Sequence, residues 1–258
     1  MKEYGKRLRL TPDEAELIES IRSHQVKRLG MEPIVNAENR ILIIGDLHAP
    51  FIKEGYLDHC IEIGCKYDTT HTIFIGDVVD NHYSSFHSTD PDGYGSGEEL
   101  DRAVDQLKEW HAAFPSADVV MGNHDRIIMR KAFASGISSR WIRDLSDVLE
   151  TPTWRFDLSF EYNDVLYIHG EGGGGEKGAM MKALNKRKSV VQGHWHTQNH
   201  INWNVSEVDR IFGMQIGCGI DDKAYALAYA KYNIRRSILS CGVVLDNGKL
   251  PILEPMRL

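Results

Sequence analysis

The sequence predicts an α/β fold in which two β-sheets pack face to face and helices cover the outside. Short apolar runs alternate with helical segments through the first half of the chain, as in an α/β layer. Paired strand-like segments around turn residues dominate the second half and add further β-structure. We therefore expect a β-rich layered core with its site at the C-terminal ends of strands.

The first half contains three expected strands and two expected helices. Each strand is a short apolar run that ends at a polar cluster, and the first two runs are uninterrupted, as is typical of strands covered on both faces. In the second helix, apolar residues recur at helical spacing. The strands are expected at residues 40–45, 72–75 and 118–121, and the helices at residues 56–66 and 100–114.

The second half contains two expected hairpins. They turn at Asn163-Asp164 and at Asn247-Gly248, and the second pair of residues suits a type I′ turn. A glycine-rich stretch, residues 170–175, is expected to be a mobile loop that leads into a helix. The hairpin strands are expected at residues 154–162 with 165–168 and 237–245 with 250–253, other strands at 189–192 and 210–216, and the helix at 177–188.

The 258 residues accommodate one large domain, expected at residues 39–258, with an N-terminal helical extension at residues 1–38. In this extension Thr11, Pro12 and Glu14 supply the capping hydroxyl, first-turn proline and third-position glutamate of a helix start. Neither the role of the extension nor the oligomeric state follows from the sequence.

Composition indicates a protein of the cytoplasm. The four cysteines form no CxxC pair, which favours reduced thiols, and no apolar run approaches the ~18 residues of a membrane span. The formal net charge of -7 gives no indication of a basic surface, so nucleic acid is not a favoured partner. Any anionic substrate would need a local positive centre, which a bound metal can supply.

Five short motifs rich in Asp, His and Asn follow expected strands. Each motif alone is weak, because such short runs are common in ordinary turns. Their carboxylate, imidazole and amide groups, without thiolates, suit borderline or hard divalent cations. The motifs are Asp46-Leu47-His48, Gly76-Asp77-Val78-Val79-Asp80, Gly122-Asn123-His124-Asp125, His169-Gly170 and Gly193-His194-Trp195-His196.

Taken in this order, the motifs resemble those of the calcineurin-like metallophosphoesterase superfamily, whose pattern is DxH, GDxxD, GNH(D/E), H and GHxH. The resemblance implies an α/β/β/α sandwich of two mixed β-sheets that hydrolyses a phosphate ester with two divalent cations. Mn²⁺ is favoured, and Fe, Zn, Mg or Ni are alternatives. The layout also looks similar to small members encoded in phage genomes, which would place the protein in the host cytoplasm.

The resemblance implies a role for each motif residue. A water or hydroxide between the two cations would attack phosphorus in line. One cation would be bound by Asp46, His48 and His196, the other by Asn123, His169 and His194, and Asp77 would bridge both.

His124 matches the family histidine that would protonate the departing oxygen, with Asp125 orienting its imidazole. Asp80 is expected to accept a hydrogen bond that fixes a ligand or His124. Arg126, which opens a further helix, and His82 are candidate substrate contacts, as is His87 in the same loop.

Two features depart from particular branches of the family. Members of the Ser/Thr phosphatase branch have Arg-Gly after the GDxVD motif, whereas this chain has Asn81-His82. The arginine that could bind phosphate through two hydrogen bonds is therefore missing. A local basic segment is expected to be a solvated helix face, with a nucleic-acid contact as the alternative. It comprises Lys177, Lys182, Lys186, Arg187 and Lys188.

The leading functional hypothesis is hydrolysis of phosphomonoesters or phosphodiesters of small or nucleotide-like molecules. The alternatives are a nuclease of the DNA-repair phosphoesterase type, a protein Ser/Thr phosphatase and a non-catalytic, metal-stabilised scaffold. The net charge disfavours the long basic groove that a nuclease would need. The presence of His124 together with Asp125 argues against the scaffold.

Overall fold

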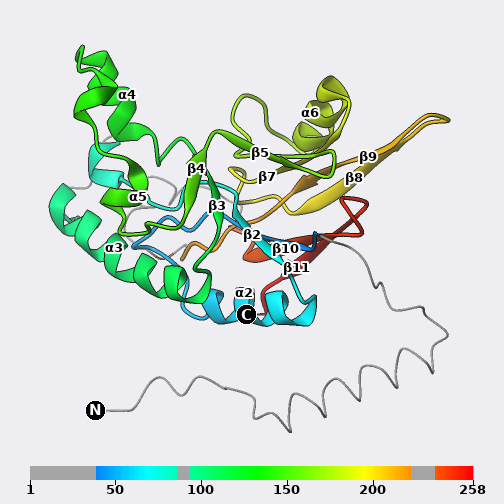
Figure 1. Ribbon diagram of the computed structural model, residues 1–258, viewed down its shortest axis with the longest axis horizontal. Coiled ribbons are helices and arrows are strands. Elements are labelled where there is room, and N and C mark those ends of the chain that lie inside the picture. The colour runs from blue at the N-terminus through cyan, green and yellow to red at the C-terminus, as the bar shows by residue number, and fades with distance from the viewer. Residues whose placement is uncertain (1–38, 86–92, 222, 224–235, 258) are drawn as a thin grey trace, which may run out of the picture. The chain divides into compact units, whose positions relative to one another are not determined.

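The computed structural model describes residues 39–85, 93–221, 223 and 236–257, and two mixed β-sheets form its centre (Figure 1). The N-terminal extension expected at residues 1–38, and His87, lie outside the described residues. No helix in the described ranges is both long enough and apolar enough to cross a membrane.

The first sheet has six strands: β1 (Ile41–Ile44), β2 (His71–Phe74), β3 (Asp118–Val120), β4 (Arg155–Asp157), β10 (Ser240–Leu245) and β11 (Leu250–Pro255). Their order is β11-β10-β1-β2-β3-β4. The strands β1 to β4 are parallel, whereas β10 is antiparallel to β1 and to β11. The C-terminal ends of β1, β2 and β3 therefore meet at one edge of this sheet.

The second sheet has five strands: β5 (Ser159–Tyr162), β6 (Val165–Ile168), β7 (Ser189–Gln192), β8 (His200–Val205) and β9 (Arg210–Gln215). Their order is β5-β6-β7-β9-β8. The central strands β6, β7 and β9 are parallel, and both outer strands are antiparallel to their neighbours. Sequence analysis did not anticipate β8, although its polar and apolar residues alternate from His200 to Val205.

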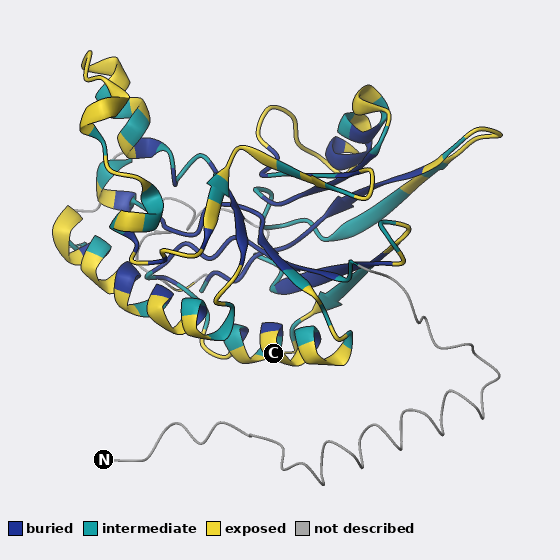
Figure 2. Cartoon of the chain, in the orientation of Figure 1, coloured by how far each residue is buried: buried dark blue, intermediate teal, exposed yellow. Residues whose placement is uncertain are grey.

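Helices cover the outer faces of both sheets. Figure 1 shows α2 and α3 along the first sheet and α6 over the second, and Figure 2 shows that each turns its buried side inward. The helices are α2 (Tyr56–Lys66), α3 (Ser96–Ala113), α4 (Ile127–Ala134), α5 (Leu145–Val148) and α6 (Gly178–Lys186), with 3₁₀ turns η1 (His82–Ser84) and η2 (Ser139–Trp141).

Buried side chains fill three layers, which confirms the predicted α/β/β/α order. In β1, Leu42 and Ile44 pack towards the helices, whereas Ile41 and Ile43 pack against the second sheet. A strand with both faces covered must be apolar throughout, and this explains its uninterrupted apolar run. The third layer, which includes Met180 of α6, packs against the other face of the second sheet.

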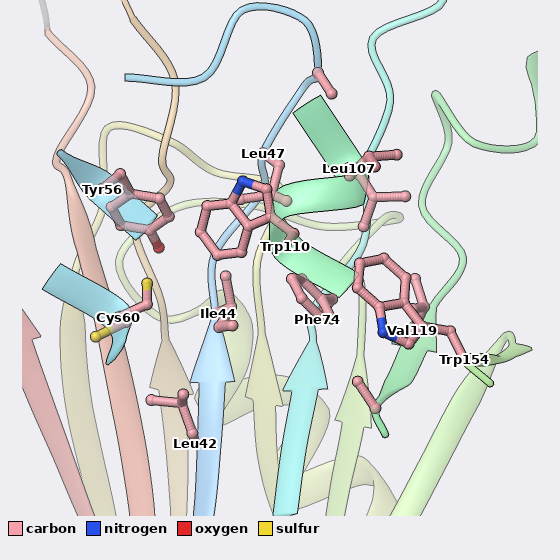
Figure 3. Packing of buried hydrophobic residues seen from close by; sticks show 14 of the residues in the cluster. Leu42, Ile44, Leu47, Tyr56, Cys60, Phe74, Leu107, Trp110, Val119 and Trp154 are labelled. Atoms are coloured by element: carbon pink, nitrogen blue, oxygen red, sulfur yellow. The ribbon is translucent and has the colours of Figure 1, made fainter. Parts of the chain in front are cut away.

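The layer between the first sheet and its helices contains the aromatic side chains of Tyr56, Phe74, Trp110 and Trp154 among aliphatic ones (Figure 3). The ring of Phe74 lies 4.5 Å from that of Trp154 and 5.9 Å from that of Trp110, measured between centroids. The Tyr56 hydroxyl, buried in the same layer, accepts a hydrogen bond from the Gly45 N–H at 3.1 Å and donates to the Ser240 carbonyl at 2.8 Å. This layer thereby fixes the end of β1.

The single strand expected at residues 154–162 is two strands in different sheets. Its first part, β4, pairs with β3, its last part, β5, pairs with β6, and Leu158 between them is exposed. Apolar residues recur at every second position from Trp154 to Tyr162, so the sequence pattern continues unbroken across the change of sheet. The prediction of one strand was wrong for this reason.

Both predicted hairpins form, but their turns differ. Asn163 and Asp164 have φ of 52° and 59°, so both adopt the left-handed conformation that a type I′ turn requires. In the second hairpin, register pairs Leu245 with Leu250, which leaves a four-residue loop rather than the expected two-residue turn. Asn247 and Gly248 nevertheless both take positive φ within it.

We predict that Phe74→Ala lowers the free energy of unfolding by about 3–5 kcal/mol, because it opens a cavity between two tryptophans. Phe133→Ala, at a half-exposed position, should change it by no more than about 0.5 kcal/mol. Urea unfolding midpoints at an unchanged slope would measure both. Equal losses in the two variants would contradict this packing.

Candidate metal centre and active site

Acidic and histidine side chains gather where strands of the two sheets end. Besides a group of His48, Asp80 and His124, they form two groups that have no residue in common, and within each of these two groups one potential ligand atom from every residue lies within 4.8 Å of the others. The first sheet supplies the acidic residues and one histidine, and the second sheet supplies the remaining histidines. One group is Asp46, His48 and His196, and the other is Asp77, His169 and His194.

In the first group, His196 Nε2 lies 3.0 Å from Asp46 Oδ2, and the His48 and His196 rings are 5.0 Å apart. His48 Nδ1 lies 2.5 Å from Asp80 Oδ1. Because a carboxylate can only accept, Nδ1 is the donor, and the lone pair of Nε2 is left for another partner. Asp80 thus orients His48, and the acceptor role expected for it matches this contact.

In the second group, His169 donates from Nδ1 to the Ile75 carbonyl at 3.0 Å, which leaves the Nε2 lone pair for a ligand bond. This Nε2 atom lies 3.0 Å from Asp77 Oδ2, 3.2 Å from Asn123 Oδ1 and 3.1 Å from His194 Nδ1. The four side chains expected around the second cation therefore converge on one place.

Asp77 lies between the two groups. Its Oδ2 atom is 3.0 Å from His169 Nε2 and 3.6 Å from His48 Nε2, while its Oδ1 atom accepts the backbone N–H of His124 at 2.8 Å. One oxygen thus faces both groups, as the bridging role expected for this residue would require, and the other fixes the orientation of the carboxylate.

Two motif glycines make this close assembly sterically possible. A Cβ atom at Gly122 would overlap the Asp77 carboxylate, and one at Gly193 would overlap Oδ1 of Asp46. Each glycine therefore makes room for a carboxylate supplied by a different motif. The Gly-Asn-His-Asp and Gly-His-Trp-His patterns are coupled through space to the motifs that precede them in the chain.

The electrostatic environment of the site favours bound positive charge. Burial opposes protonation of His169, but the charges of Asp77 and Asp46 outweigh burial and raise the pKa of His169 to about 10. Burial and the nearby His169 lower the pKa of His194. The same carboxylates that attract a proton to His169 would attract a metal cation in its place.

Two further observations indicate that the residues of this site are suited to bind a pair of cations. Asp46 Oδ1 and His48 Nε2 are buried and have no hydrogen-bond partner among the described residues. Such atoms are costly to bury unless something else satisfies them. In addition, the ion pairs that Asp46, Asp77 and Asp80 form within the described residues are with histidines.

His124 is positioned by a different group from the expected one. Its Nδ1 donates to the backbone carbonyl of Asp80 at 2.5 Å, and its ring lies 4.6 Å from that of His48. The Asp125 carboxylate instead accepts backbone N–H groups of Asp77, Val79 and Gly122. Through these bonds Asp125 holds two motif loops together.

Burial and the nearby charge of Asp77 raise the pKa of Asp125 to about 7, although its backbone donors oppose this. Burial also opposes protonation of His124, but Asp77 and Asp80 raise its pKa. The imidazole of His124, with its raised pKa, thus lies beside the two groups of acidic and histidine side chains.

The two candidate substrate contacts are constrained. Arg126 forms an ion pair with Glu171 and donates from Nε to the Gly122 carbonyl at 3.0 Å. His82, expected in an exposed loop, is buried, because its backbone N–H is held by Glu99 at 2.6 Å in η1. Substrate contact stays a prediction for Arg126, whereas the burial of His82 runs against it.

Asn81 occupies the position where the Ser/Thr phosphatase pattern has arginine. Its side-chain amide donates to the His124 carbonyl at 3.1 Å and so braces the turn that carries this histidine.

Several residues near the site were not anticipated. Lys182, expected on a solvated helix face, is half-buried, and burial lowers its pKa. Gln192 and Gln215 are buried at the ends of β7 and β9, and Glu99 is buried in α3. A polar residue at the end of an apolar run marks the two glutamines weakly, and nothing in the pattern marks Glu99.

A scan of family models matches residues 39–215 to the calcineurin-like phosphoesterases. A search of curated proteins found no match. Among solved structures, the chain is similar to Vacuolar Protein Sorting 29 from Cryptosporidium parvum at 11% identity and a TM-score of 0.47, covering 86% of this chain and 93% of that one.

Two further similar structures are a metallophosphoesterase from Sphaerobacter thermophilus and Yfce, a phosphoesterase from E. coli. The first is 15% identical with a TM-score of 0.41 and covers 86% of this chain and 89% of its own. The second is 15% identical with a TM-score of 0.38 and covers 81% and 88%. The family match spans more than half of the sequence and all five motifs, and the chain therefore belongs to the calcineurin-like phosphoesterase family.

Proposed function

We propose that the protein hydrolyses phosphate esters of small or nucleotide-like molecules with the help of two divalent cations, Mn²⁺ being the favoured metal. Asp46, His48 and His196 would hold one cation, and Asn123, His169 and His194 the other. Asp77 would contact both.

The position of Asp77 carries this proposal. Its Oδ2 atom faces His48 from one group and His169 from the other, at 3.6 and 3.0 Å. A shared carboxylate is the usual means by which two cations are held close enough to act on one phosphoryl group. A single metal would need only one of the two groups, whereas this structure assembles both.

When bound, the cations would supply Lewis acidity that neutralises charge on the phosphoryl oxygens and makes water a stronger nucleophile. The side chains around them serve to keep the ligands in place. His48 Nδ1 donates to Asp80 Oδ1, with 2.5 Å between the two atoms, and His169 Nδ1 donates to the Ile75 carbonyl oxygen at 3.0 Å. Both imidazoles therefore present Nε2 as the ligand atom.

His124 is the proposed general acid. Its Nδ1 donates a hydrogen bond to the Asp80 carbonyl at 2.5 Å. Nε2 is therefore the atom that would carry a proton to the departing oxygen. The ring is partly exposed, with 17% of its side chain accessible, and therefore stands at the boundary between ligands and solvent. Asp77 and Asp80 raise its pKa, which favours the protonated form that an acid needs.

We predict that chelator-treated protein has no esterase activity and that Mn²⁺ restores it towards p-nitrophenyl phosphate or bis-p-nitrophenyl phosphate. Both esters and single-stranded DNA should be compared at equal metal concentration. Faster cleavage of DNA than of either ester would favour the nuclease alternative. No turnover of any ester or phosphopeptide with Mn²⁺, Fe, Zn, Mg or Ni would favour the scaffold.

We predict that His124→Ala lowers kcat on phenyl phosphate by about 10²–10⁴-fold, the usual contribution of a general acid. The loss should be smaller on p-nitrophenyl phosphate, because its leaving group needs less protonation. His111→Ala, at a partly buried histidine that contacts Thr153 on a helix outside the site, is the matched control and should leave both rates unchanged.

Metal content of the His124→Ala protein, measured by elemental analysis, should equal that of the wild type. An equal loss of rate on the two esters, or none, would contradict the assignment of His124 as the acid.

A further inference from the structure

A polar cluster lies behind the glycine-rich loop, on helix α6 and the second sheet. Lys182 of α6 donates from Nζ to the Gly170 carbonyl at 2.5 Å, to the Gly173 carbonyl at 3.2 Å and to Gln192 Oε1 at 2.8 Å. An ammonium group has three donors, and here all three are directed at neutral oxygen atoms of the protein. The side chain is therefore part of the structure rather than a solvated surface charge.

Two buried glutamines extend the cluster towards the site. Gln192 Nε2 donates to Gln215 Oε1 at 2.8 Å, and Gln215 Nε2 donates to the Gly193 carbonyl at 2.8 Å. Both glutamines are only 1% exposed. A continuous chain of hydrogen bonds thus runs from Lys182 through both amides to the backbone of Gly193.

The cluster ends on the backbone beside two proposed ligands. Gly170 follows His169 directly, and Gly193 precedes His194. The Gly193 N–H donates to the His169 carbonyl at 2.9 Å, so the two turns are also bonded to each other. Gly170 and His194 have φ of 117° and 71°, and turns of this left-handed kind persist when their surroundings hold them in place.

The lysine at one end and backbone carbonyls at the other fix the direction of this chain of hydrogen bonds. Because an ammonium group can only donate, the Gln192 oxygen must face it, and the Gln192 amide nitrogen must then face the oxygen of Gln215. Gln215 is in turn obliged to direct its nitrogen at the Gly193 carbonyl. The Gly193 and Ile216 carbonyls, which can only accept, hold Gln215 Nε2 in the same direction from the other end. Loss of the ammonium group would leave the buried Gln192 oxygen and the Gly170 and Gly173 carbonyls without this donor.

We propose that Lys182, Gln192 and Gln215 are positioning residues that hold His169 and His194 in the arrangement required to bind the second cation. This inference rests on the proposed function, since it assumes that these histidines are ligands. The cluster touches neither Asp46 nor His48 directly, so its loss should weaken the second cation more than the first.

The test compares Mn²⁺ binding to the wild type and to Lys182→Met, which keeps the length of the side chain and removes its donors. Titration calorimetry should show one of the two binding steps weakened by about 10–100-fold, the usual effect of losing a group that orients a ligand. Electron paramagnetic resonance should show the signal of isolated Mn²⁺ in place of the coupled pair. Lys186→Met, at an exposed position on the same helix, is the matched control and should bind as the wild type does.

Two additional variants separate positioning from general folding. Lys182→Arg retains cationic donors and should recover at least part of the lost affinity. If Lys182→Met does not fold, Gln215→Met interrupts the same chain of bonds and should weaken the same binding step.

Two results would overturn the proposal. One is that Lys182→Met and Gln215→Met bind each of the two cations with the same affinity as the control Lys186→Met, which would show that the cluster has no part in metal binding. The other is wild-type protein that takes up fewer than two Mn²⁺, and this result would contradict the proposed function as well. The two failures are distinguished because only the second appears in the wild type.

Discussion

The rest of the site depends on one electrostatic constraint, the burial of four carboxylates in a small volume. Asp46, Asp77, Asp80 and Asp125 are each at most 3% exposed. Charges of one sign cannot be buried together without compensation, and the cost in a low-dielectric interior is several kcal/mol or more for each ion. Histidines and backbone N–H groups meet part of this cost, and bound cations are the compensation that the remaining unsatisfied ligand atoms call for.

The sandwich meets this constraint by dividing the ligands between its layers. The ends of β1, β2 and β3 carry all four carboxylates, whereas three of the imidazoles follow β6 and β7 of the other sheet. Contacts across the layers fix the two sets together, since His169 donates to the Ile75 carbonyl and the His194 N–H donates to Asp46 at 2.9 Å. The packing of one sheet on the other is therefore what brings the acidic and imidazole side chains of the proposed metal centre to one place.

Sequence reasoning succeeded where a local pattern determines the structure. Each ligand follows a short apolar strand, so the strand ends and the convergence of Asp46, Asp77 and Asn123 could be anticipated from the parallel α/β arrangement. It failed where the partner is a backbone atom or a distant side chain. Nothing in Gly-Asn-His-Asp shows that His124 bonds to the Asp80 carbonyl instead of Asp125, and a helical lysine followed by basic residues gives no sign that Lys182 is directed inward.

Backbone conformation explains why such hidden partners matter at this site. Among the proposed ligands, His48, Asp77 and His194 all have positive φ, at 49°, 49° and 71°, although none is glycine. Residues in this region are individually unfavourable by about 1–3 kcal/mol and persist only when several contacts determine them. Asp125 holds the backbone of Asp77, and the Lys182 cluster holds the turn before His194. The same contacts that bear this strain keep the ligands in place before a cation arrives, and preorganisation of this kind reduces the cost of binding it.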